Sequence, residues 1–376
     1  MKKLIYLILL SFSLLACSKD RLDIPPKTPV ENPQDPPPGE NETPEDPAEQ
    51  VPTIKLQVRM KIGDVIYDNL PAGLSLFSWD SQGQQSLSYH SVSAGINELT
   101  LPADRQKFRF KVSKWGSNLE LNVDTKDIVA DSVYVLQATK EARKLKTEYV
   151  YLLKNNNYVA ETKTDYIYNT DGNLGQVVLN RKKSDGRPYV HQVSKFEYQG
   201  KQVQRISRYD EANKLYGFTN FTYSNGQITG IYENEAGEET IAKLEHYFEL
   251  RHELVIKYTY PSRTYSRHYH MLFEDGNLRE GNSTTSHHSS ELSRYRYDQL
   301  VNPYAHMNWP DLYLSHSSKN NVNALEQSFV NDYPGAVPSS HAYTYDSEGY
   351  PKELIRTYKS GFTGEYLYTT KTVFVY

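Results

Sequence analysis

The chain has 376 residues, of which 42 are basic and 46 acidic, and its formal net charge of −4 excludes the basic footprint of a nucleic-acid-binding protein. Its single cysteine excludes an internal disulfide framework. Tyrosine is the unusual component, with 32 tyrosines against 12 phenylalanines.

The first residues follow the plan of a secretory leader. Lys2 and Lys3 supply positive charge, and residues 4–10 form an apolar run too short to span a bilayer. The Leu-Leu-Ala sequence before Cys17 resembles the lipobox of bacterial lipoproteins, which implies a diacylglycerol on that thiol and palmitate at the same residue. We predict a signal peptide at 1–16 and lipid attachment at Cys17, because a free thiol is a liability in an oxidising compartment. The alternative is an ordinary signal peptide with an unmodified cysteine.

Residues 17–52 are predicted to be a lipidated, disordered spacer. Ten of the chain's 19 prolines lie between Pro25 and Pro52, with acidic residues in many of the gaps, so this stretch has little apolar surface to bury. Its start, Ser18-Lys19-Asp20, is similar to the short export signal of Bacteroidota surface lipoproteins. The similarity implies attachment to the outer membrane and exposure at the cell surface.

Apolar and polar residues alternate from Thr53 onward, which predicts short half-buried strands. About seven such strands predict a small β-sandwich at 53–143. The run from Gly95 to Phe110 resembles the end of transthyretin-like or carboxypeptidase-regulatory-like modules, which implies a non-catalytic spacer or adhesive domain. The alternating apolar positions are Ile54, Leu56, Val58 and Met60, then Leu74 and Leu76, then Phe108, Phe110 and Val112, and finally Val133 and Val135 beside Tyr134 and Leu136.

Residues 144–376 are repetitive. An aromatic residue, any residue and then a tyrosine recur just before a glycine turn, and a second set of turns lies about halfway between these glycines. This pattern predicts hairpins joined into a long antiparallel meander. Two further pairs, Tyr247 with Phe248 and Tyr295 with Tyr297, are expected to fill degenerate repeats. The turn glycines are Gly172, Gly200, Gly226, Gly276 and Gly349.

The segment Tyr345–Pro351 resembles the YD repeats of the RHS family and of tyrosine-rich Bacteroidota lipoproteins. RHS proteins enclose a toxin in a shell of many such repeats, whereas here the repeats are few and most lack the aspartate after the tyrosine. We expect the repeat architecture without an effector role. The predicted fold class is therefore all-β, with a small N-terminal β-sandwich followed by a long antiparallel β-meander of YD-like hairpin repeats.

The sequence contains no recognisable catalytic or metal-binding signature, so we predict no catalytic residue, metal or other cofactor. His268 and His270 share one strand face, but Arg267 places positive charge beside them. The segment that starts at His252 begins like the zinc-protease motif, yet Ile256 occupies the position of the second histidine.

The segment from Asn302 to Tyr313 interrupts the repeat and is the candidate ligand-binding region. Pro303 and Pro310 argue for a loop, because proline removes a ladder hydrogen bond in mid-strand, and loops on rigid scaffolds often carry binding. We predict Trp309 as an anchor, with Tyr304 and Tyr313 beside it. The alternative is that this tryptophan plugs the end of the sheet.

These observations predict an outer-membrane lipoprotein, facing either the cell surface or the periplasm, with a non-catalytic binding or structural role. Its expected partners are the membrane, through the lipid, and a glycan or another envelope protein. The tyrosine ladders form either the core of a thin sheet or an exposed platform for sugar rings. The alternative function is a hydrolase acting on envelope or dietary polysaccharide, which would need two acids and an aromatic residue in one cleft.

Overall fold

Strands make up nearly all the regular structure of the chain, which confirms the all-β prediction. The computed structural model describes residues 51–68, 70–182, 190–248, 252–261, 266–285, 290–307, 309, 318–329, 337–361 and 363–376. In these ranges the only helices are the short 3-10 turns η1 (Thr125–Asp127) and η2 (Pro303–His306), and no helix there has the length and hydropathy to cross a bilayer. The predicted leader, Cys17 and almost all of the spacer lie outside the described residues.

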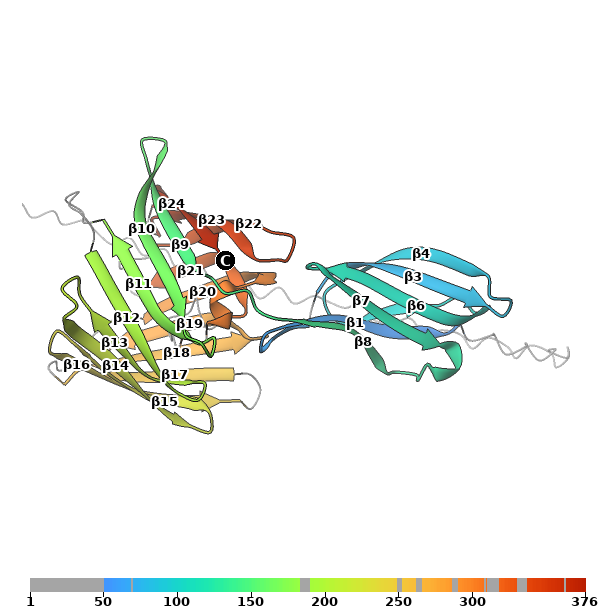
Figure 1. Ribbon diagram of the computed structural model, residues 1–376, viewed down its shortest axis with the longest axis horizontal. Coiled ribbons are helices and arrows are strands. Elements are labelled where there is room, and N and C mark those ends of the chain that lie inside the picture. Colours follow the sequence, from blue (N-terminus) through green and yellow to red (C-terminus); the bar gives the residue numbers. More distant parts are fainter. Residues whose placement is uncertain are drawn as a thin grey trace, which may run out of the picture. The chain divides into compact units, whose positions relative to one another are not determined.

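The first eight strands form two four-stranded sheets (Figure 1). In one sheet, β1 pairs antiparallel with β2 and β5 and parallel with β8. The other sheet has the order β4-β3-β6-β7 and is antiparallel throughout. The strands are β1 (Thr53–Ile62), β2 (Val65–Tyr67), β3 (Ala72–Asp80), β4 (Gln85–Val92), β5 (Asn97–Thr100), β6 (Arg105–Lys114), β7 (Ser117–Asp124) and β8 (Val133–Lys140).

Both sheets contribute to one hydrophobic core. Alternate side chains of β1, including Leu56 and Met60, are fully buried together with Phe108 and Phe110 of β6. This is the face that period-two alternation selects, because successive side chains of a strand point to opposite sides. In β8, where both faces carry apolar residues, Leu136 is the buried one.

The remaining strands form a closed antiparallel barrel of 16 strands in the described part of the chain. Each strand pairs with its neighbours in the sequence, and β24 pairs with β9 to close the ring, for example through Thr370 and Leu152. Closure leaves the sheet without exposed edges. The strands are β9 (Thr147–Lys154), β10 (Asn157–Tyr168), β11 (Leu174–Arg181), β12 (Val190–Gln199), β13 (Gln202–Tyr209), β14 (Leu215–Ser224), β15 (Gln227–Glu235), β16 (Glu238–Tyr247), β17 (His252–Thr259), β18 (Ser266–Glu274), β19 (Asn277–Thr285), β20 (Ser290–Val301), β21 (Asn320–Phe329), β22 (Ser339–Tyr345), β23 (Pro351–Lys359) and β24 (Tyr366–Val375).

The five predicted turn glycines all lie between paired strands and have positive φ. Gly349 shows why glycine is needed. Its φ is +83°, and a Cβ atom there would lie 2.7 Å from Nε1 of Trp115, which follows β6. A larger residue would therefore be strained and would also collide with the indole ring.

The repeated tyrosines have a common structural role. The tyrosine at the end of an outgoing strand donates its hydroxyl to a backbone carbonyl at the start of a neighbouring hairpin strand, over 2.7–3.1 Å. A phenylalanine could pack in the same place but could not make this bond. The donor–acceptor pairs are Tyr168 and Leu145, Tyr198 and Leu174, Tyr223 and Val203, Tyr297 and Leu278, and Tyr376 and Pro351.

One repeat departs from the predicted phase. Tyr247 and Phe248, which were expected to fill it, are about half exposed. His246 lies one position earlier and takes the inward place, with its Nε2 atom 3.0 Å from the carbonyl oxygen of Ile228. Because a histidine occupies the position that a tyrosine takes in the other repeats, the aromatic pattern in the sequence did not place this repeat correctly.

The two faces of the barrel differ in chemistry. Buried apolar residues from strands around the ring, with Tyr304 and Trp309, form shared clusters in the interior. The intervening residues must point outward, as Lys257 does between buried Ile256 and Tyr258. Outward positions carry ion pairs, which place charged groups on the outer face of the barrel. These pairs are Lys163–Asp165, Lys257–Glu245, Arg294–Glu280, Arg296–Glu326 and Lys371–Glu353.

The turn before β23 is joined to the first eight strands. Tyr350 is completely buried in the core that the two sheets share, and its hydroxyl accepts a hydrogen bond from the Arg143 backbone N–H at 3.0 Å. Two ion pairs flank this ring, one between Arg143 and Asp346 and one between Lys140 and Glu348.

Candidate functional site

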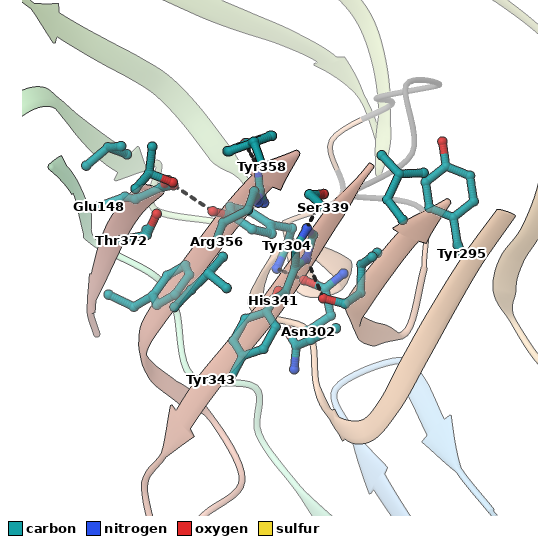
Figure 2. A pocket seen from close by; sticks show the side chains of 17 residues that line it. Glu148, Tyr295, Asn302, Tyr304, Ser339, His341, Tyr343, Arg356, Tyr358 and Thr372 are labelled. Carbon is teal, nitrogen blue, oxygen red and sulfur yellow. Dashed lines mark hydrogen bonds between the residues drawn. The ribbon is translucent and has the colours of Figure 1, made fainter. Parts of the chain in front are cut away.

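The barrel interior contains a cavity of about 390 Å³. Its walls are inward-facing side chains of β9 and β20 to β24, and the segment that contains η2 contributes Asn302 and Tyr304 (Figure 2). These strands come from both ends of the barrel sequence, so the cavity depends on the closure of β24 against β9.

One wall of the cavity is organised around Glu148 of β9. A single carboxylate oxygen, Oε2, accepts the hydroxyl of Tyr304 at 2.6 Å and that of Tyr166 at 3.0 Å. Burial, reinforced by the charge of Glu148, raises the pKa of both hydroxyls well above the ordinary value. Both tyrosines therefore remain neutral donors at physiological pH, and they hold the carboxylate in a fixed orientation.

Further round the barrel, β22 and β23 contribute neutral and positive groups to the cavity. His341 has its Nδ1 atom 2.6 Å from the Val322 carbonyl oxygen and its Nε2 atom 2.9 Å from Ser339 Oγ. Burial, followed by the nearby charge of Arg356, lowers the pKa of His341 to about 4. The ring is neutral at pH 7, so the proton belongs on Nδ1, and Nε2 accepts from the serine hydroxyl.

Arg356 of β23 is the cationic group of the cavity. Its Nη1 atom donates to the Tyr358 hydroxyl at 3.0 Å, while its Nε atom is buried and has no hydrogen-bond partner. Aromatic rings lie on either side. Tyr343 stacks on Tyr345 at 5.7 Å, and Tyr358 stacks on Tyr368 at 4.3 Å. The cavity thus combines aromatic faces with fixed donors and acceptors.

The three predicted ligand-binding residues have different locations. Tyr304 lines the cavity. Trp309 is half-buried and lies edge-on against Phe196, with 5.4 Å between ring centroids, in the same interior cluster as Tyr304. Tyr313 lies outside the described residues. Both described aromatic residues therefore project into the barrel.

Three cavity residues were missed by sequence reasoning, namely Glu148, His341 and Arg356. One signal was available for the arginine, because Arg356 follows buried Leu354 by two positions and so shares the inward face. A charged residue on an apolar strand face suggests a functional interior. Glu148 offered no comparable signal, since its strand, TEYVYLLK, alternates weakly.

The histidines considered for a metal site lie elsewhere. His268 and His270 lie on the outer side of β18, where His270 Nε2 is 3.0 Å from a Glu253 carboxylate oxygen. Within the described ranges, no three histidine, cysteine, aspartate or glutamate side chains are grouped closely enough to hold a metal ion.

Comparisons with known proteins give a limited result. No protein-family model matches the chain, and no curated protein matches it. Among solved structures, the chain is similar to a porin-like protein from Bacteroides uniformis ATCC 8492, at 12% identity and a TM-score of 0.44, over 62% of this chain and 98% of that one. It is also similar to a porin-like protein from Bacteroides vulgatus ATCC 8482, at 12% identity and a TM-score of 0.39, over 62% of this chain and 99% of that one.

Proposed function

We propose that this chain is a non-catalytic lipoprotein of the outer membrane whose barrel binds a small saccharide in the interior cavity. The observation that carries the proposal is the lining of that cavity. Small-ligand sites typically enclose about 300–1,000 Å³ and combine aromatic walls with a few placed polar groups. The cavity of about 390 Å³ has this composition, since tyrosine rings alternate with Glu148, His341, Arg356 and hydroxyl groups.

A saccharide suits this lining better than an apolar ligand does. A sugar ring presents C–H faces to aromatic side chains and hydroxyls to planar polar groups. Tyr343 and Tyr358 supply the faces, while Glu148 and Arg356 supply an acceptor and a donor.

Binding is favoured over hydrolysis by the acid content of the cavity. Glycosidases normally use a pair of carboxyl groups on either side of the scissile bond. Among the described residues that line the cavity, Glu148 is the only carboxylate, and one of its oxygens is held by two tyrosine hydroxyls.

The membrane attachment in this proposal rests on lipid at Cys17. A barrel that spans a bilayer shows an apolar band about 25 Å tall on its outer face. The outward positions of this barrel instead carry paired charges such as Lys257–Glu245 and Arg294–Glu280. The charged surface supports a barrel that stands in water, with the lipid as its anchor.

The architecture in this proposal is a lipid anchor, a spacer, a β-sandwich and a YD-like repeat barrel. The sandwich assignment is supported by the single core between the two four-stranded sheets. The relation to YD repeats is supported by the recurrent glycine turns and by the tyrosine hydroxyls that bond neighbouring hairpins.

The test is saccharide binding to the mature lipidated chain in detergent, measured by calorimetry with a panel of mono- and oligosaccharides. Thr370→Trp fills the cavity, whereas Thr357→Trp places the same bulk on the outer side of the paired strand. We expect saturable binding that the first variant abolishes and the second retains, with thermal unfolding as the check on folding. Absence of binding across the panel, or unchanged binding in a folded Thr370→Trp variant, would refute the proposal.

A further inference from the structure

Interior arginines of the described strands differ in their partners. Arg208, Arg267 and Arg356 each lie on the face of their strand that also carries interior residues. Arg208 pairs with Glu233 at 3.0 Å, and Arg267 pairs with Glu291 at 3.5 Å. Arg356 has no carboxylate within ion-pair distance in the described part of the chain.

The unpaired arginine is also the one that lines the cavity. A guanidinium stays charged in proteins and has five donors, and leaving a charge unpaired in a protein interior is costly. The Tyr358 hydroxyl accepts from one donor of Arg356, and the buried Nε has no partner. Arg208 and Arg267 also have one unpartnered buried nitrogen each, so the lack of a carboxylate is what distinguishes Arg356. The neighbouring His341 donates to a backbone carbonyl and is not an anionic partner.

The carboxylate of Glu148 does not fill this role. Glu148 shares the cavity but lies on β9, two strands along from β23, and one of its oxygens accepts from Tyr166 and Tyr304. The cavity therefore offers donors at Arg356 of β23 and a fixed acceptor at Glu148 of β9, with β24 between their strands (Figure 2).

We propose that the cavity selects a saccharide that bears a carboxylate, a hexuronic acid residue, and that this carboxylate pairs with Arg356. The inference rests on the proposed saccharide-binding function and specifies its ligand class. A guanidinium matches a carboxylate with two parallel hydrogen bonds, which is the geometry that an arginine with free donors provides. The tyrosine faces distinguish the site from a simple anion site, because they contact the ring of the sugar.

The experiment compares matched sugars on the mature chain in detergent by calorimetry. D-galacturonate is compared with D-galactose, D-glucuronate with D-glucose, and acetate serves as a carboxylate without a ring. A charge-assisted hydrogen-bonded pair corresponds to a preference of about tenfold or more, so we expect each uronate to bind at least about tenfold more tightly than its neutral partner. Acetate should bind much more weakly than either uronate.

Variants of Arg356 test whether this residue causes the preference for uronates. Arg356→Met should remove the preference for the uronates, so that each uronate and its neutral partner bind within about twofold of each other, since the charged pair is lost. Arg356→Lys keeps the charge but loses the planar fork, and should retain part of the preference. Arg294→Met removes the same charge from the outer face, where the side chain is 61% exposed, and should change nothing.

The outcomes separate the two proposals. Equal binding of uronates and neutral sugars would overturn the carboxylate inference and leave saccharide binding intact, whether or not the Arg356 variants fold. Failure of every sugar to bind would overturn both. Acetate binding as tight as that of the uronates would indicate an anion site without sugar recognition and would also overturn both. A preference that survives in folded Arg356→Met would overturn the assignment to that arginine.

Discussion

Replacement of Tyr350 by alanine is the most direct test of how the barrel is joined to the first two sheets. The ring of Tyr350 is fully buried and lies edge-on to Tyr376 at 5.2 Å, with the guanidinium of Arg143 5.3 Å from its centre. Its position in the turn before β23 brings a barrel residue into the core of the two sheets. Removal of the ring therefore opens a cavity in a core that both parts share.

The expected cost follows from burial. A tyrosine buries roughly 150–250 Å² of surface, which at about 25 cal/mol per Å² corresponds to about 4–6 kcal/mol. Measured aromatic-to-alanine changes in cores cost about 3–5 kcal/mol, so we expect Tyr350→Ala to lower the free energy of unfolding by that amount. Tyr350→Phe keeps the ring but leaves the Arg143 N–H without its acceptor, which costs about 1–3 kcal/mol.

The assay is urea unfolding followed by tryptophan fluorescence and circular dichroism, with Tyr366→Ala as the control. Tyr366 is 55% exposed, so its loss should change stability by less than about 0.5 kcal/mol. We also expect the two probes to report one transition, because Tyr350 of the barrel is buried in the core of the two sheets. A loss below about 1 kcal/mol in Tyr350→Ala, or equal losses in the alanine and phenylalanine variants, would show that ring burial does not hold this junction.

Three further predictions concern the anchor, acid stability and the interior tryptophan. Cys17→Ser should abolish fatty-acid labelling and release the chain from membranes, and a variant that still labels would contradict lipid attachment at that residue. Burial lowers the pKa of His306 and His341 to about 4 from 6.5, so the unfolded chain binds protons that the fold excludes, and urea midpoints should fall as the pH drops from about 6.5 to 4. His341→Gln should flatten this fall, and an unchanged pH profile would count against the burial argument. Trp309→Ala should cost about 2 kcal/mol, less than a fully buried ring, because the indole is half-buried against Phe196; little loss of stability with lost saccharide retention would instead support an exposed platform.

Local patterns in the sequence predicted the strands well where one face is apolar. In β1 every predicted apolar position is buried, because alternation alone fixes which side of the strand meets the core. In β8 both faces carry apolar residues, so the pattern could not choose between them, and packing against the other sheet selected Leu136 over Val133, which is 38% exposed. The glycine turns were predictable for a similar local reason, since positive φ favours glycine.

Closure of the barrel and the position of the cavity could not be read from local patterns. The pairing of β24 with β9 joins residues more than 200 positions apart, such as Thr370 and Leu152, and no periodicity in either strand encodes that partner. The cavity depends on this pairing, because Glu148 and Arg356 reach the same space only when the ring closes. The segment with Tyr304 and Trp309 was identified as unusual, but the placement of these two side chains inside the barrel is set by tertiary contacts.

The polar groups of the interior give the strongest reason to place a ligand in this cavity. The repeated tyrosines satisfy their hydroxyls on the backbone of neighbouring hairpins, as Tyr198 does with the Leu174 carbonyl, so these residues hold the barrel and need no ligand. Arg208 and Arg267 are likewise matched by acids from nearby strands. Among these three interior arginines, Arg356 alone has no carboxylate partner, and its side chain lines the cavity. Since buried charges are normally paired, the missing carboxylate is most simply supplied by what the cavity binds.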